Sequence, residues 1–316
     1  MIVALAGGVG GARLAVGLAA VLPPQRLMFV VNTGDDFEHL GFRISPDLDT
    51  VMYTLAGVNN AVAGWGRADE TWNFMETLQE LAGEAWFRLG DRDLAVHTLR
   101  TLALRRGVPL SRITATLATR FGIRHPIVPM SDVPVRTRVR TDRGELSFQD
   151  YFVRRRCKPR VRGFRFVGSR KARVPSVLRR LCRTDKVQAV VFCPSNPFVS
   201  IAPILSVPEI RTWLIRRGFP VIAVSPVVGG AAIKGPAAKM LRELGGEVSA
   251  LGVARHYGAW VDGWVIDVRD AQLRGAIERE GKAVLITDTV MSDRSKSVRL
   301  AKRVVSFARA LASGAL

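Results

Sequence analysis

The sequence predicts an α/β protein with a doubly wound, mostly parallel, Rossmann-like sheet that carries a helical and β-hairpin insertion. Short continuous apolar runs predict the strands, because parallel strands buried on both faces have this pattern. Each run ends in a polar turn, and the carboxyl ends of parallel strands form one crevice in which ligands bind. The five turns are therefore expected to build a single site. The runs cover residues 2–6, 27–31, 187–192, 220–224 and 283–286.

Helical segments alternate with these strands and also fill much of the middle of the chain. We expect 1–58 plus 186–316 to form a Rossmann-like nucleotide-binding core. Residues 59–185 are expected to be an inserted subdomain that covers the site, with a hairpin whose turn is Thr141–Gly144. Helices are expected over residues 12–20, 47–57, 69–81, 91–106, 111–121 and 296–311.

The composition is that of a soluble globular protein, apart from its charge. Among 316 residues, 47 Lys and Arg face 27 Asp and Glu, which leaves a net charge of +20 that attracts anionic ligands. Much of the excess lies in 154–173, where a solvated basic face is the simpler explanation. Dedicated nucleic-acid binding is not expected, because no zinc-ligand, stacking or recognition-helix pattern accompanies the charge.

The cysteines and the hydropathy of the chain indicate the cellular compartment to expect. The three cysteines have no metal-ligand spacing and read as reduced thiols, so we expect a cytoplasmic protein. The apolar N-terminus is expected to be a strand, turn and helix rather than a signal peptide. No apolar run of about 18 residues is evident, so no membrane span is expected.

The first turn is rich in glycine. Gly7, Gly8, Gly10 and Gly11 would let backbone amides approach a phosphate, at the N-terminus of the helix that follows. The spacing is neither the dinucleotide fingerprint nor a Walker A loop. A tight turn without a ligand is the alternative.

The second turn begins a cluster of carboxylates. Asn32 and Thr33 precede Asp35 and Asp36, and Asp47 and Asp49 follow within fifteen residues. Mg²⁺ prefers such ligands, and phosphate oxygens and water complete its shell. N-capping of a helix that starts near Asp47 explains at least one of the four carboxylates without a metal.

Two later turns supply further candidates. Ser195 and Asn196 lie between two prolines and could hold a phosphate or the edge of a base, although a structural turn is also possible. Lys234 follows a flexible glycine pair and is a natural phosphate partner. Because no Ser-His-Asp pattern or nucleophile elbow occurs, a covalent protein nucleophile is not expected.

Several longer segments together resemble the 2-phospho-L-lactate transferase family of coenzyme F-420 biosynthesis. They include GGVGGARLAVGL, DLDTVMYTLAG, WFRLGDRDLAVHTLRT, CPSNPFVSIAPIL and VSPVVGGAAIKGP, in this order. The resemblance runs from about residue 2 to 300. Two departures are Val9, where many relatives have Thr, and the single Asp132, where relatives often have two acids.

The resemblance implies a Mg²⁺-dependent phosphotransferase, homodimeric in general, that acts on small molecules. The ribityl hydroxyl of the deazaflavin FO would attack a guanosine diphosphate ester of a three-carbon acid, and GMP would leave. The acid could be phospholactate, phosphoenolpyruvate or phosphoglycerate. Metal ligands and a possible base would come from Asp35, Asp36 and Asp49, phosphate and substrate contacts from Gly7, Gly8, Gly10, Gly11, Asn32, Thr33, Asp47 and Lys234, guanine contacts from Ser195 and Asn196, and contacts to FO from Arg88 and Asp91.

The same kind of fold leaves two other functions open. A non-catalytic regulator that binds nucleotide sugars would share the sheet and the glycine turn. Such proteins typically continue with a Ser/Gly-rich segment after the paired aspartates, whereas this chain continues FEHLGFRISPDLDT, which favours the enzyme. A dehydrogenase is disfavoured because no acidic residue follows a proper fingerprint at about 20 residues.

Overall fold

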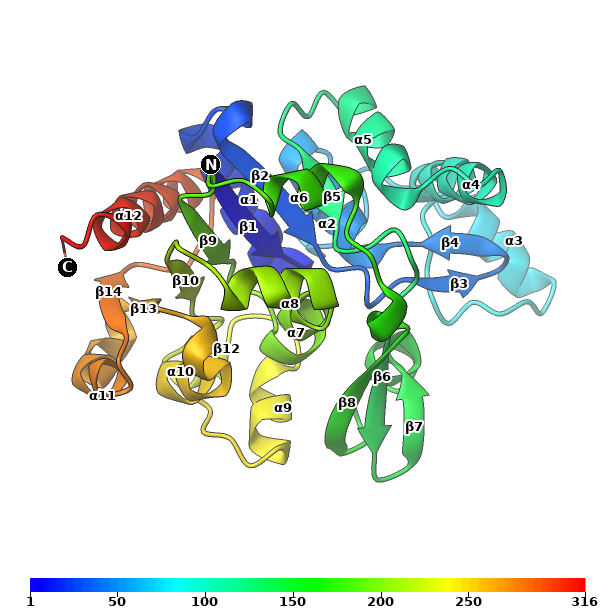
Figure 1. Ribbon diagram of the computed structural model, residues 1–316. Coiled ribbons are helices and arrows are strands. Elements are labelled where there is room, and N and C mark those ends of the chain that lie inside the picture. Colours follow the sequence, from blue (N-terminus) through cyan, green and yellow to red (C-terminus); the bar gives the residue numbers. More distant parts are fainter. Residues whose placement is uncertain (316) are drawn as a thin grey trace.

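A seven-stranded parallel sheet forms the centre of the protein and confirms the predicted α/β class (Figure 1). The computed structural model describes residues 1–315. The strand order is β14-β13-β10-β9-β1-β2-β5, so the chain leaves β1 in one direction toward β2 and returns on its other side at β9. The strands are β1 (Ile2–Ala6), β2 (Leu27–Val31), β5 (Ile127–Pro129), β9 (Ala189–Phe192), β10 (Val221–Val224), β13 (Gly263–Asp267) and β14 (Ala283–Thr287).

Helices cover both faces of this sheet, because its strands are apolar on both sides. In β1, Ile2, Ala4 and Ala6 pack into one hydrophobic cluster, while Val3 and Leu5 pack into the other. The first cluster lies against α1, α2, α5 and α12, and the second lies mainly against α6 to α10. The helices are α1 (Gly8–Val21), α2 (Pro46–Ala56), α3 (Asn73–Glu80), α4 (Asp91–Arg105), α5 (Leu110–Arg120), α6 (Ser176–Leu181), α7 (Ala202–Leu205), α8 (Pro208–Ile215), α9 (Ala237–Glu243), α10 (Ala250–Tyr257), α11 (Arg274–Arg279) and α12 (Arg294–Ala312).

The core sheet takes one strand from within the expected insertion. β5 pairs with β2, with Phe29 opposite Ile127 and Val31 opposite Pro129. This strand lies inside 59–185, so the core extends beyond the predicted 1–58 plus 186–316. A run of three residues is too short to be recognised as a strand in the sequence.

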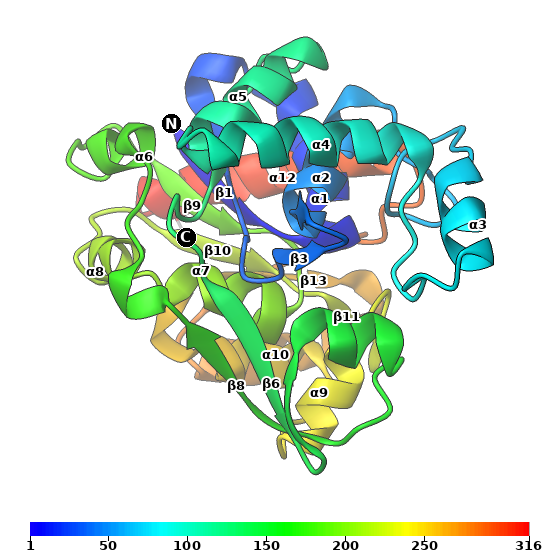
Figure 2. The same cartoon turned by 90° about the vertical axis from the view of Figure 1, so that its right-hand side faces the viewer.

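Two smaller sheets lie beyond the carboxyl ends of the core strands (Figures 1 and 2). The predicted hairpin is present as β6 (Arg136–Thr141) and β7 (Gly144–Ser147), and β8 (Val161–Val167) pairs with the other side of β6. β3 (Phe37–His39) and β4 (Phe42–Ile44) form a separate hairpin that packs with α3 on a small cluster of its own. A two-residue hairpin joins β11 (Val227–Val228) to β12 (Ala231–Ala232).

No single helix in residues 1–315 is long and apolar enough to cross a membrane; the segments Pro197–Leu205 and Pro208–Ile215 meet those criteria only together, with a bend of 85° between them.

The contact between α1 and α12 depends on a glycine. A methyl group at Gly17 would collide with the carbonyl oxygen of Ser297 in α12. We expect Gly17→Ala to lower the free energy of unfolding by about 1–3 kcal/mol, because the two helices must separate. Urea denaturation measures this change. Gly218→Ala is the control, since no atom among the described residues lies within 4 Å of a methyl group there. Equal stability of the two variants would contradict the prediction.

Candidate active site

The glycine turn after β1 packs directly on the turn after β9. The hydroxyl of Ser195 donates to the carbonyl oxygen of Gly7 at 2.8 Å, and the Gly7 amide donates back to Ser195 Oγ at 3.2 Å. A methyl group at Gly10 would collide with the carbonyl oxygen of Pro194, and one at Gly11 would lie 2.6 Å from Ser195 Oγ. The two turns therefore meet at the point where the strand order reverses, which is where ligands bind in such sheets.

Asn32 and Asp47 tie the second strand to the same place. The amide nitrogen of Asn32 donates to Asp47 Oδ2 at 2.9 Å and to the carbonyl oxygen of Val199 at 3.1 Å. Asp47 Oδ1 accepts from the Gly8 amide at 2.8 Å, at the start of α1. Burial raises the pKa of Asp47 to about 6. Both oxygens of Asp47 thus join elements of the site, and turns predicted from three distant strands do converge.

Asp35 and Asp36 are buried beside this junction, with exposed fractions of 6% and 8%. Asp36 Oδ2 accepts from the Ser45 hydroxyl at 2.8 Å. One oxygen of each carboxylate, Oδ1, has no hydrogen-bond partner within residues 1–315. Burial raises the pKa of Asp36 to about 7, against the opposing field of Arg136. Burial, followed by the charge of Asp47, raises the pKa of Asp35 well above its ordinary value.

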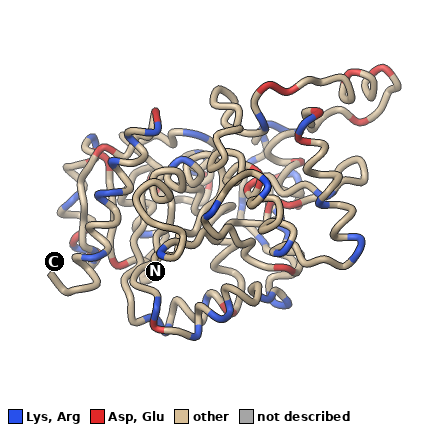
Figure 3. The backbone as a smooth tube through the Cα atoms, turned by 90° about the horizontal axis from the view of Figure 1, so that it is seen from above, with Lys and Arg blue, Asp and Glu red and all other residues tan. Residues whose placement is uncertain are grey.

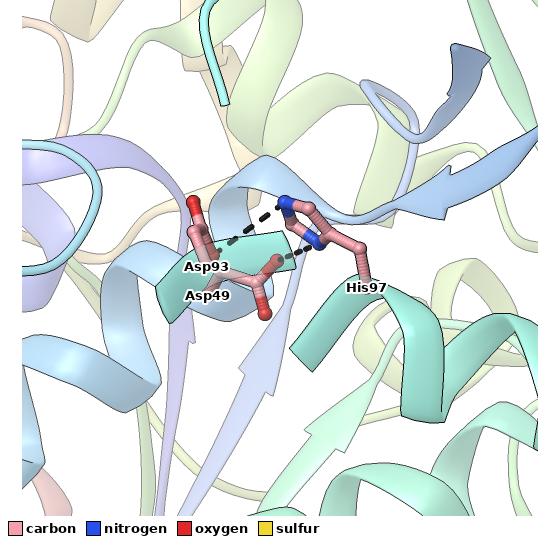
Figure 4. Close-up of side chains that lie close together, drawn as sticks. All are labelled: Asp49, Asp93 and His97. Carbon is pink, nitrogen blue, oxygen red and sulfur yellow. Dashed lines mark ion pairs between the residues drawn. The ribbon is translucent and has the colours of Figure 1, made fainter. Parts of the chain in front are cut away.

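Asp49 points into a buried cluster of charged side chains. Arg100 Nη1 donates to Asp49 Oδ2 at 3.0 Å, and Nη2 pairs with Oδ1. His97 Nδ1 lies 3.7 Å from Asp49 Oδ2, and His97 Nε2 lies 3.5 Å from Asp93 Oδ1 (Figure 4). Asp49, Asp93 and His97 offer ligand atoms within 4.8 Å of one another, which could hold a metal ion. The guanidinium of Arg100 already neutralises the Asp49 carboxylate at this position, where a metal ion would do the same.

The site residues predicted from the sequence do not include Asp93, His97 or Arg100. All three belong to α4 and share one face of it, because they are spaced four and three residues apart. Arg100 is buried, with 2% exposed, and the Tyr53 hydroxyl donates to Asp93 Oδ1 at 2.5 Å. Their helical spacing is the signal that could have identified them: one Asp, one His and one Arg share a helix face in a chain that also has an Asp-rich segment.

Two other expected ligand contacts lie near the junction. Asn196 Oδ1 accepts from the Phe198 amide at 2.9 Å, so part of its side chain caps the following segment. Lys234 is exposed, and a methyl group at Gly64 would lie 2.7 Å from its Nζ and 3.2 Å from Val9 Cγ1. Lys234 and the loop around Gly64 therefore both reach the glycine turn.

The residues expected near FO have contacts of their own. The guanidinium of Arg88 lies over the Trp72 ring, 4.1 Å from its centre. Asp91 accepts hydrogen bonds from Thr71 and from the Asn73 and Phe74 amides, so it caps α3. These contacts explain Asp91 structurally without a ligand.

A cavity of about 490 Å³ adjoins Asp36 on the side of β2 and β5. Its lining residues include Thr33, Arg43, Arg105, Asp132 and Arg136. Asp132 accepts from the amide and the hydroxyl of Ser111 at the start of α5, at 2.7 and 3.0 Å. The cavity thus has both apolar and charged lining residues, and one of them is Asp36, a carboxylate with an unpartnered oxygen among the described residues.

Removal of the Arg100 charge tests the buried cluster. Arg100→Met would leave the Asp49 carboxylate buried without its cation, so we expect a loss of about 3–5 kcal/mol in the free energy of unfolding. Asp49→Asn in the same chain should recover part of this loss, since it removes the uncompensated charge. Arg255→Met, which breaks an exposed pair with Glu280, is the control and should unfold close to the wild type in urea. An Arg100→Met variant as stable as that control would contradict the prediction.

Known proteins similar to this chain match it over nearly its whole length. The chain is 42% identical to a phosphoenolpyruvate transferase of Streptomyces griseus, over 97% of this chain and 98% of the relative. It is 40% identical to a 2-phospho-L-lactate transferase of Methanosarcina mazei, over 95% of this chain and 97% of the relative. Among solved structures, a member of the upf0052 family from Bacillus halodurans has the same fold, with a TM-score of 0.63 at 12% identity over 96% of this chain and 98% of that one.

A family model also covers almost all of the chain. It is described as 2-phospho-L-lactate transferase CofD and matches residues 2–305. The match includes the glycine turn, the paired aspartates, the α4 cluster and the Ser195 turn. The chain belongs to the 2-phospho-L-lactate transferase CofD family.

Proposed function

We propose that this transferase of coenzyme F-420 biosynthesis moves a phosphorylated three-carbon acid from a guanosine diphosphate ester to the deazaflavin FO and releases GMP. One observation carries the proposal: two buried carboxylates, each with an unpartnered oxygen in the described chain, lie beside a glycine turn that is joined to the Ser195 turn. Relatives named for phosphoenolpyruvate and for 2-phospho-L-lactate are about equally similar to this chain, so the proposal does not specify which three-carbon acid is transferred.

Asp35 and Asp36 fit a magnesium ion better than the other acids do. Their free oxygens are buried and of the type that Mg²⁺ prefers. The two oxygens of Asp47 accept hydrogen bonds from Asn32 and Gly8, and Arg100 neutralises Asp49. We therefore assign Asp35 and Asp36 as ligands and Asp49 as a residue that positions the cluster behind them. A bound ion would offset negative charge on the diphosphate.

The order of the strands suggests how the donor would lie. The turns of β9 and β1 would hold the guanosine and its diphosphate, through Ser195, Lys234 and the amides that start α1. The attacking hydroxyl must approach opposite the leaving group. The cavity beside Asp36 is on the side away from β9, and we therefore place FO there rather than beside Asp91.

The transfer itself exchanges one bond at the β-phosphorus. The ribityl oxygen of FO bonds to this phosphorus, and the bond from it to the bridging oxygen breaks. That electron pair leaves with GMP. The hydroxyl proton is released to solvent, because both carboxylates of the Asp35–Asp36 pair are assigned to the metal and phosphoryl transfer requires little proton chemistry from the protein.

A direct assay tests the proposal. Purified protein is mixed with FO, Mg²⁺ and guanylylated phospholactate, guanylylated phosphoenolpyruvate or guanylylated phosphoglycerate, each in turn. We expect one of the three to give GMP and a product whose mass equals FO plus the phosphorylated acid, less water. Mass spectrometry identifies both products. Absence of GMP release with all three donors would refute the function.

The raised pKa of Asp36 predicts a stability that depends on pH. Because burial raises this pKa from 3.8 to about 7, the folded protein binds the proton more tightly than the unfolded chain. The contribution of Asp36 to stability is therefore full below pH 3.8 and is lost as the pH rises through 7. In EDTA, Asp36→Asn should raise the melting temperature by several degrees at pH 8 and by little at pH 5.

Calorimetry of both proteins at the two pH values measures this effect. Asp288→Asn changes an exposed carboxylate and serves as the control, with no such difference between pH 5 and pH 8. Added Mg²⁺ should stabilise the wild type more than Asp36→Asn, since the variant lacks a ligand. A melting difference that is the same at both pH values would contradict the assigned pKa.

A further inference from the structure

The positive charge of the protein is concentrated in one part of the chain. Residues 133–183 contain seventeen Lys and Arg and three Asp and Glu. The three acids are already engaged: Asp142 accepts from the Arg160 amide, and Glu145 and Asp150 form ion pairs with neighbouring arginines. By contrast, residues 68–87 around α3 contain five acids and no Lys or Arg (Figure 3). The net charge of +20 is therefore largely a property of the β6–β8 sheet and its flanks.

Arginines form a row along one face of the central strand of that sheet. Arg136, Arg138 and Arg140 alternate with the buried residues Thr137, Val139 and Thr141. They share a face, with about 7 Å between successive residues. Arg165 of β8 stands opposite Arg138 and holds Glu145 through two hydrogen bonds, at 3.1 and 2.6 Å. The carboxylate nearest to Arg138 and Arg140 on this face is thus shared with a third arginine.

The row begins inside the active-site cavity. Arg136 lines the same cavity as Asp36, and its charge acts on the pKa of Asp36. From there β6 runs outward, so Arg138 and Arg140 follow in order away from the cavity (Figure 2). Like charges on one face of a sheet repel one another and lower stability. A phosphate-bearing molecule that approaches the site from this side would meet the row before it reaches the glycine turn after β1.

We propose that Arg138 and Arg140, continuous with Arg136 in the cavity wall, form a capture surface for the phosphate-bearing donor nucleotide. The proposal rests on the proposed function, which supplies a donor with several negative charges. A positive row that leads to a low-dielectric cleft concentrates anions there and raises their association rate by about 10- to 1000-fold. Arg138 and Arg140 act through this field and do not touch the reacting atoms.

The chemistry of the face favours a small phosphate compound over nucleic acid. Single-stranded nucleic acids need aromatic side chains on which the bases stack. The aromatic side chains of β8, Phe164 and Phe166, point away from the arginine face and pack on the core. Phe164 stacks on Phe198, with 5.6 Å between ring centres. Arg138 has Ser147 and Arg165 beside it instead.

The association rate of GDP tests the proposal without any need for turnover. Stopped-flow mixing compares the wild type with Arg138→Gln/Arg140→Gln at several salt concentrations. Lys302→Gln/Arg303→Gln is the matched control, because it removes the same charge from exposed positions of α12, at the opposite end of the molecule (Figure 1). We expect the β6 variant to bind GDP about tenfold more slowly at low salt, with an unchanged dissociation rate. The rates should converge near 1 M salt, where the screening length is about 3 Å.

Three results would overturn the capture surface. One is an equal loss of rate in the α12 control, which would indicate only a net-charge effect. Another is a loss that persists at 1 M salt, which would indicate a damaged site. The third is displacement of GDP from the wild type, but not from the β6 variant, by single-stranded DNA, which would indicate a nucleic-acid site. If the double variant does not fold, Arg138→Gln and Arg140→Gln alone should each give a smaller loss with the same salt dependence. Failure of every protein to bind GDP would instead refute the donor, and with it the proposed function.

Discussion

The site depends on a close approach of two backbone turns that no side chain would permit. Gly7, Gly10 and Gly11 lie against Asp47, Pro194 and Ser195, and a methyl group at any of the three would collide with or crowd them. Because of this contact, the halves of the sheet on either side of β1 share one ligand-binding edge. The glycine turn is therefore first a packing element. The same geometry lets the Gly7 amide donate to Ser195 and the Gly8 amide donate to Asp47.

Four buried carboxylates at one edge of a sheet would repel one another if all four were ionised in the same environment. The fold resolves this by giving each a different environment. Asp47 is held by neutral amide donors, and Asp49 is held by the guanidinium of Arg100. Asp35 and Asp36 retain an unpartnered oxygen among the described residues, and burial raises their pKa values. The two residues to which we assign metal binding are thus the ones that keep an unpartnered oxygen among the described residues.

Periodicity and turn chemistry were sufficient for most of the fold, while tertiary contacts decided the rest. Five core strands could be predicted, because each is an apolar run with a polar end. β13 was missed because Gly263–Asp267 has only three successive apolar residues, Trp264–Ile266, and β5 because it is equally short. The contact of Ser195 with Gly7 could be expected, because the carboxyl ends of parallel strands meet at one edge of the sheet. The contact of Asp49 with Arg100 could not be expected in this way, since it joins α2 to a residue of α4 that is 51 positions away. Sequence spacing carries no information about which helix face will meet which strand end.

The packing of α12 on α1 has a consequence for how the protein is made. β1 and α1 leave the ribosome well before their partners β9 and α12, which lie much later in the sequence. Leu14 and Leu18 cannot be buried against Leu300 and Val304 until α12 has been synthesised. At the usual pace of translation this delay is on the order of ten seconds or more. During that interval the apolar face of α1 lacks the cover of α12, and exposed apolar surface of this kind favours aggregation or chaperone binding.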